Sequence, residues 1–174
     1  MGHCRSQQGH SRFNVRKSLW KRSASSVSKL GQHIFIMTDE ELYNELAYYT
    51  LSHPDPSFIH QHVVDAYAAQ HASEKTKSIQ LVFALVGLYL YVDKGFTGKQ
   101  VQKAHMQLAK RRKNWEQPPF PDCEGAITIR DVLAAPAGRQ RDLIIREWCI
   151  SVWNAWSKER DQIAILVKNE LGIG

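Results

Sequence analysis

The chain has 174 residues, 43% of them apolar, and carries 23 Lys and Arg against 17 Asp and Glu. This length and composition suit one globular domain with its own core, and they exclude collagen-like, mucin-like and wholly disordered chains. The formal charge of +6 is unevenly distributed, because residues 1–36 hold seven Lys and Arg and no acid, whereas residues 37–174 hold 16 basic and 17 acidic residues. The basic character therefore belongs to the N-terminal segment.

Residues 1–36 mix Ser, Arg, Lys, Gln and His with scattered large apolar residues, without helical or alternating periodicity. We therefore expect a disordered basic segment. Its composition matches that of a transit peptide, and it matches equally that of a basic arm that attracts phosphates. We expect nucleic-acid binding only through such an arm. A third interpretation is an upstream extension, because Thr38-Asp-Glu-Glu41 follows Met37 directly and forms a helix-opening capping box. The helical domain is accordingly placed at residues 37–174.

Helical periodicity, caps and prolines predict four helices in succession, at residues 38–52, 56–71, 74–93 and 97–113. Asp55 is expected to cap the second helix, with Pro56 at its first position. The third is apolar on nearly every side over residues 79–92, but these fourteen residues fall short of the about 20 that span a membrane. We expect it to be the central core helix, and we expect no membrane association.

The C-terminal half continues the helical pattern after a proline-rich loop at residues 115–125. Thr128-Ile-Arg-Asp131 should cap a short helix that ends near Pro136, and a long helical pattern follows at residues 138–171 with an expected break at residues 157–161. No strand pattern is present. The sequence thus predicts an all-α fold, a single-domain bundle of five to six helices. Three cysteines without a Cys-x-x-Cys pair favour a reducing, cytoplasmic environment.

Residues suited to metal or acid–base chemistry gather on the second predicted helix. At about 100° per residue, His60, Tyr67 and His71 fall on one stripe, and Asp65 lies on a neighbouring face. His60 and His71 are eleven residues apart, or roughly 16 Å along a helix, so a shared site requires side chains from other helices. His105, on the apolar stripe of the fourth helix, and Glu147 are the candidates to supply them.

Two kinds of site follow from these residues, and both remain open at this point. One or two histidines with Asp65 or Glu147 can hold a divalent metal such as zinc, for which the first set is His60, Asp65 and His71. They can also form a His–carboxylate general base, so the chain can be an enzyme or not. No phosphate-binding loop, nucleophile elbow or dinucleotide-binding fingerprint is present.

Each candidate also has a purely structural interpretation. A histidine on an apolar helix face commonly bonds a backbone or carboxylate group through one nitrogen and otherwise fills space, and we expect this of His60 and His105. Asp65 is either an exposed residue or a buried acceptor. If buried, it should pair with Arg130, Arg139 or Trp156, because an isolated carboxylate in a core is very costly.

The tryptophans of the long C-terminal pattern suggest a different function. Trp148, Trp153 and Trp156 occupy two helix faces, of which we expect at most one to be core, and we expect core packing for Trp148 and Trp156. An exposed Trp-bearing face would make the chain a non-enzymatic interaction or dimerisation module, with a homodimer or a protein partner.

A resemblance covers residues 42–171 and no part of the first 36. It rests on the segments His60-Gln-His-Val-Val-Asp-Ala-Tyr-Ala-Ala-Gln-His71 and Val152-Trp-Asn-Ala-Trp156. The chain resembles a family of small bacterial proteins of unknown function that carry His-x4-Asp-Ala-Tyr-x2-Gln-His and a C-terminal Val-Trp-x-Ala-Trp. The resemblance implies no activity, and the polar positions that match are His60, Asp65, Tyr67, Gln70, His71 and Gln80.

The chain departs from the family pattern at two points. Ala84 stands where the resemblance leads us to expect His, and the Cys-x-x-Cys that often precedes the domain is missing. Both departures weaken the metal interpretation and favour a degenerate site or a structural polar cluster.

Overall fold

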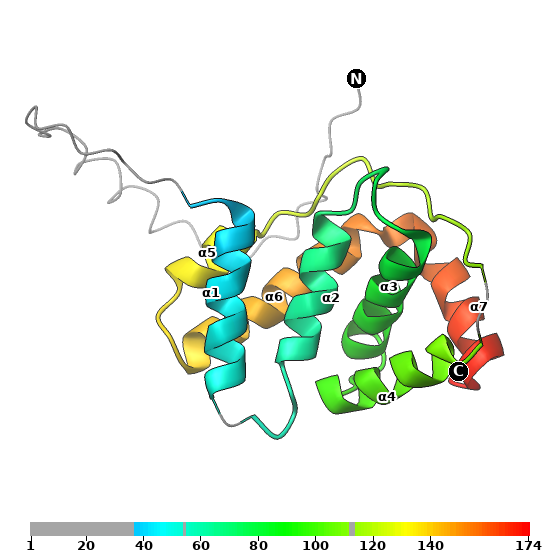
Figure 1. Ribbon diagram of the computed structural model, residues 1–174, viewed down its shortest axis with the longest axis horizontal. Helices are drawn as coiled ribbons and strands as arrows, with labels where there is room; N and C mark the ends of the chain where they lie inside the picture. The colour runs from blue at the N-terminus through cyan, green and yellow to red at the C-terminus, as the bar shows by residue number, and fades with distance from the viewer. Residues whose placement is uncertain (1–36, 54, 112–113) are drawn as a thin grey trace, which may run out of the picture. The chain divides into compact units, whose positions relative to one another are not determined.

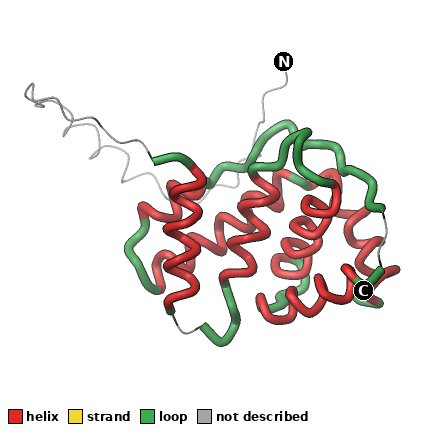
Figure 2. The backbone as a smooth tube through the Cα atoms, in the orientation of Figure 1, coloured by secondary structure: helices red, strands yellow, loops and turns green. Residues whose placement is uncertain are grey.

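The computed structural model describes residues 37–174 except residues 54 and 112–113 (Figure 1). The predicted disordered segment at residues 1–36 lies outside the described residues. Within the described part the secondary structure is entirely helical, with no strand, which confirms the predicted all-α class (Figure 2). The elements are α1 Asp39–Ser52, α2 His60–Gln70, α3 Ser78–Val92, α4 Gly98–Ala109, α5 Ile129–Ala134, α6 Arg139–Ala155, the 3-10 helix η2 Ser157–Glu159 and α7 Arg160–Leu171.

Seven α-helices in the described part exceed the predicted five to six, because the long C-terminal pattern is divided. The 3-10 helix η2 separates α6 from α7 inside the polar stretch where a break was expected. No helix in the described ranges combines the length and apolar character needed to cross a bilayer.

Local hydrogen bonds start three helices at the predicted positions. The Thr38 amide donates to Glu41 Oε2 at 2.7 Å at the start of α1, and the Thr97 amide donates to Gln100 Oε1 at 2.8 Å at the start of α4. The Thr128 amide donates to an oxygen of the Asp131 carboxylate, also at 2.8 Å, before α5. These caps satisfy amides that would otherwise lack a partner in the first turn.

The predicted start of the second helix is wrong by four residues, since α2 begins at His60 and not at Pro56. Asp55 does cap, but it accepts from the amides of Ser57 and Ile59 in a turn that precedes the helix. Phe58 has φ +60°, a left-handed conformation that an α-helix cannot contain. The third helix also begins later than predicted, at Ser78, because residues 73–76 form a turn closed by the Ser73 carbonyl and the Thr76 amide.

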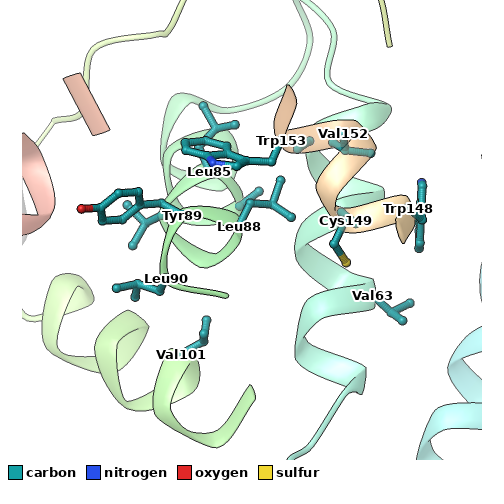
Figure 3. Packing of buried hydrophobic residues seen from close by; sticks show 14 of the residues in the cluster. Val63, Leu85, Leu88, Tyr89, Leu90, Val101, Trp148, Cys149, Val152 and Trp153 are labelled. Carbon is teal, nitrogen blue, oxygen red and sulfur yellow. The ribbon is translucent and has the colours of Figure 1, made fainter. Parts of the chain in front are cut away.

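The core is built around α3, which packs against α2, α4, α6 and α7, as expected for a central helix. Figure 3 shows buried side chains of α2, α3, α4 and α6. Five of the labelled residues are 0% exposed, namely Val63, Leu85, Leu88, Val101 and Val152. On the far side of the domain α1 and α5 lie side by side against α2 and α6 (Figure 1). The helices α2, α3 and α4 contact one another on the other side of the domain, so polar side chains of α2 can face α3 and α4 there.

The expectation that at most one Trp-bearing face is core is wrong. Trp148 and Trp153 are 0% exposed and Trp156 is 2% exposed. In Figure 3 Trp153 lies toward Leu85 and Leu88 of α3, whereas Trp148 lies on another side of α6. Because α6 packs against α2, α3 and α5, it is covered on more than one face. These tryptophans do not form an exposed interaction surface.

Candidate functional site

A pocket of about 630 Å³ lies between α2, α3 and α4. Most of its wall is apolar, and two small side chains, Ala68 of α2 and Ala84 of α3, help to leave the space open. Residues of α2 reach it because they recur every three or four positions and so share one helix face. Four of the predicted site residues line the pocket, namely Asp65, Tyr67, His71 and His105, and the other polar residues of its wall include Gln61 and Gln80.

Asp65 is the most unusual residue of this pocket, since its side chain is buried with the residue only 3% exposed. Its Oδ1 accepts a hydrogen bond from Gln61 Nε2 at 3.0 Å, and its Oδ2 has no partner among the described residues. Burial raises the pKa of Asp65 well above its usual value, and the bond from Gln61 opposes the rise. The predicted pairing of a buried Asp65 with Arg130, Arg139 or Trp156 is wrong, because Gln61 is the group that contacts it.

A glycine on the facing helix makes room for this carboxyl group. A Cβ atom placed on Gly87 would lie 2.0 Å from Asp65 Oδ2 and 2.5 Å from Asp65 Cγ. Glycine within a helix costs about 1 kcal/mol relative to alanine, so its presence inside α3 needs a reason of this kind. The apolar run of α3 interrupted by one glycine was the sequence signal for a close approach.

His105 contributes a hydrogen-bond acceptor with a fixed orientation. Its Nε2 lies 2.9 Å from the Phe83 carbonyl oxygen, and its ring stacks on the Phe83 ring with centroids 5.3 Å apart. A carbonyl oxygen can only accept, so Nε2 carries the proton and Nδ1 of the neutral ring keeps its lone pair. Burial lowers the pKa of His105 to about 4, so the ring is neutral at physiological pH. This confirms the expected backbone bond and also places His105 on the pocket wall.

His71 and Tyr67 form an aromatic stack along another part of the wall. Tyr43 of α1 stacks on Tyr67 at 4.3 Å between ring centroids, and Tyr67 stacks on His71 at 4.1 Å. His71 is exposed, and its Nε2 lies 3.4 Å from Asp39 Oδ2. The hydrogen bond from His71, followed by one from Arg130, lowers the pKa of Asp39 despite partial desolvation. The stack joins α1 to α2 and leaves His71 accessible from solvent.

Two sequence candidates lie outside the pocket. His60 Nδ1 lies 2.8 Å from Thr50 Oγ1 of α1, and burial lowers the pKa of His60. Glu147 is exposed on α6. Among the residues that the structure describes, no three His, Cys, Asp or Glu side chains are grouped as a metal ion would require. The geometry therefore lends no support to the set His60, Asp65 and His71.

Gln70 has a structural role that accounts fully for its side chain. Its Oε1 accepts from Trp148 Nε1 at 2.8 Å, and its Nε2 donates to the carbonyl oxygens of Glu124 and Ile127, both at 2.9 Å. These bonds fasten α6 and the long loop before α5 to the end of α2. Gln70 is thus a tie between elements and does not line the pocket.

His62 is a buried histidine that sequence reasoning left aside. Its ring stacks on Tyr91 at 3.6 Å, its Nδ1 has no partner in the described part of the chain, and burial lowers its pKa to about 4. His62 does not line the pocket. It is buried like Asp65, three residues further along the same motif.

A comparison with protein-family models finds a match over residues 40–157. The chain belongs to DUF5946, a family of unknown function. The DUF5946 match contains every residue that lines the pocket and ends before α7. Ala84, the position where the resemblance led us to expect His, is part of the pocket wall of this DUF5946 chain. No curated protein and no solved structure matches the chain.

Proposed function

We propose that this chain binds a small organic molecule in the pocket between α2, α3 and α4. The observation that carries the proposal is Asp65, a buried carboxyl group with one oxygen unpartnered among the described residues, at a pocket wall. Leaving a buried polar atom without a hydrogen bond costs about 1–3 kcal/mol, and Gly87 adds the cost of a helix glycine. Such costs are typical of binding sites, where a ligand supplies the missing interaction.

The walls of the pocket support the same interpretation. Ligand sites are commonly clefts of about 300–1,000 Å³ with apolar walls and a few convergent polar groups. The present pocket, at about 630 Å³, combines Val64, Ile79 and Phe83 with the polar groups of Asp65 and His105. The proposal concerns binding. Burial raises the pKa of Asp65 and lowers the pKa of His105 to about 4, so burial favours the neutral form of both groups, which suits hydrogen bonding to a ligand.

A screen of small fragments by ligand-observed NMR tests this function on the full chain. We expect hits that lose their signal in Ala68→Phe, which fills the pocket from α2. The matched control is Ala134→Phe, since Ala134 is exposed on α5 and does not line the pocket. The proposal fails if no fragment binds, or if Ala68→Phe binds the same fragments as the control.

The finer predictions from sequence remain open beside this proposal. A divalent metal such as zinc, a homodimer or protein partner, and a cytoplasmic location are each still predictions. Elemental analysis with a zinc titration tests the first, and sedimentation of the full chain tests the second. A contact of residues 1–36 with nucleic acid would be lost on deletion of that segment.

A further inference from the structure

We infer that the molecule bound in the α2–α3–α4 pocket carries a protonated amine, whose positive charge pairs with the carboxylate of Asp65. This inference rests on the proposed binding function and names the chemical class of the ligand. The amine would occupy the inner part of the pocket, and the apolar remainder of the ligand would contact Phe83, Ile79 and Val64.

Asp65 lacks a countercharge among the described residues. Asp65 takes part in no ion pair among the described residues, where the acids that pair with Lys, Arg or His include Asp39, Asp122 and Glu170. Asp65 is instead bonded to the neutral amide of Gln61. Buried charges in proteins are almost always paired, so Asp65 needs a cation beside it in order to ionise, and a ligand can supply that cation.

The hydrogen-bonding groups of the pocket wall also suit an ammonium ion. His105 lines the pocket, and Nδ1 is the acceptor nitrogen of its ring, because the Nε2 proton is committed to the Phe83 carbonyl. Asp65 presents a carboxyl group, and Phe83 adds an aromatic ring, a group whose face attracts cations within about 6 Å. An ammonium group carries three donors and no acceptor, so it complements these groups together.

The remaining titratable neighbours of Asp65 carry no positive charge. Tyr43 of α1 and Cys149 of α6 both have a pKa raised by burial first and by the charge of Asp65 second. The empty pocket therefore favours the neutral acid. Pairing with an ammonium ion ionises Asp65, so the carboxyl proton leaves to the solvent while the amine keeps its own.

One rearrangement accompanies binding. Oδ2 of Asp65 is covered in the described structure and lies against Gly87, so the carboxylate must turn toward the pocket to meet a ligand. The hydrogen bond from Gln61 is the contact that restrains this turn, and Gln61 itself lines the pocket. Its amide can follow the carboxylate because both residues lie on the same face of α2.

Three probes of matched shape test the inference by calorimetry on the full chain at pH 7: phenethylamine, 2-phenylethanol and phenylacetate. We expect the amine to bind at least about tenfold more tightly than the alcohol, and the carboxylate to bind most weakly. Titrations in two buffers of different ionisation enthalpy should show net release of protons when the amine binds, because pairing with a cation lowers the raised pKa of Asp65. These measurements need no variant and so do not depend on how a substitution folds.

Asp65→Asn keeps the size of the side chain and removes its charge. It should weaken binding of phenethylamine at least about tenfold and abolish proton release, while binding of 2-phenylethanol stays within about twofold. Ala134→Phe, outside the pocket, should change neither.

The outcomes separate the two proposals. If the fragments that bind in the pocket are neutral or anionic and phenethylamine is no better than the alcohol, the amine inference is wrong and the binding function stands. If amine binding survives Asp65→Asn, Asp65 is not the partner and the inference is again wrong. If neither the fragments nor the three probes bind in the pocket, both proposals fail.

Discussion

Replacing Asp65 by Asn should make the protein more stable as the pH rises, relative to the natural chain. Asn matches the shape of a protonated carboxyl group, and its oxygen can still accept the bond that Gln61 Nε2 donates at 3.0 Å. At pH 4, close to the ordinary carboxyl pKa of 3.8, the two proteins should differ in free energy of unfolding by no more than about 1 kcal/mol.

The sign and size of the pH effect follow from where Asp65 ionises. Because burial raises the pKa of Asp65 in the folded protein, the folded state keeps the proton that the unfolded state releases above about pH 4. The natural chain therefore loses stability as the pH rises, at up to about 1.4 kcal/mol per unit, until the folded-state pKa is reached. Asp65→Asn lacks this loss. Its advantage grows with pH by the same amount.

Urea denaturation from pH 4 to pH 8, followed by fluorescence of the buried Trp148 and Trp153, measures this difference. Contributions from the other titrating groups cancel when the two proteins are compared at each pH. A difference that stays constant with pH, or that favours the natural chain at high pH, would show an ionised and paired Asp65 and would refute the reasoning.

Three further substitutions test the neighbouring contacts. Gly87→Ala should lower the free energy of unfolding by about 1–3 kcal/mol in urea melts, because its Cβ would lie 2.0 Å from Asp65 Oδ2; a stabilised variant would contradict this. The folded protein holds His105 neutral with a pKa of about 4, whereas the unfolded chain protonates it below the ordinary pKa of 6.5. The free energy of unfolding should therefore fall by up to about 3 kcal/mol as the pH falls from 6.5 toward 4. Thermal melts of His105→Phe should show a smaller loss of stability over the same pH range. Gln70→Ala should lower the free energy of unfolding by about 3 kcal/mol in chemical denaturation, because it leaves the Trp148 indole and two carbonyl groups unpaired. A loss under about 1 kcal/mol would show that these bonds do not hold the elements together.

The parts of the fold that were predictable from sequence are those determined by local interactions. The starts of α1, α4 and α5 depend on a residue and its neighbour three positions on, so Thr38, Thr97 and Thr128 indicated them directly. The start of α2 was not predictable in this way. It depends on the left-handed Phe58, whose carbonyl lies so close to Gly98 that a Cβ there would be 1.8 Å away.

Predicting burial from periodicity failed where a helix has more than one covered face. A single apolar stripe is expected for a helix at the surface, but α6 packs on both sides and therefore buries Trp148 and Trp153. The same limit applied to Asp65. Its position near the stripe of α2 was visible in the sequence, whereas its burial without a cation depends on Gly87 of another helix.

The candidate site was therefore only partly predictable. Four of the candidates do line one pocket, namely Asp65, Tyr67, His71 and His105. They come together because one face of α2 and one face of α4 border the same space beside α3. His60 points instead to Thr50 of α1, a contact that requires knowing how α1 and α2 pack.

The pKa of Asp65, read from the ¹³C chemical shift of its carboxyl carbon as the pH is varied, tests the central claim most directly. Because the group is buried, we expect a pKa above the usual carboxyl value in the chain alone, and a lower pKa when phenethylamine is saturating. A pKa at or below the usual value without the amine, or a pKa that the amine leaves unchanged, would contradict the claim that this buried acid is a binding group for a cation.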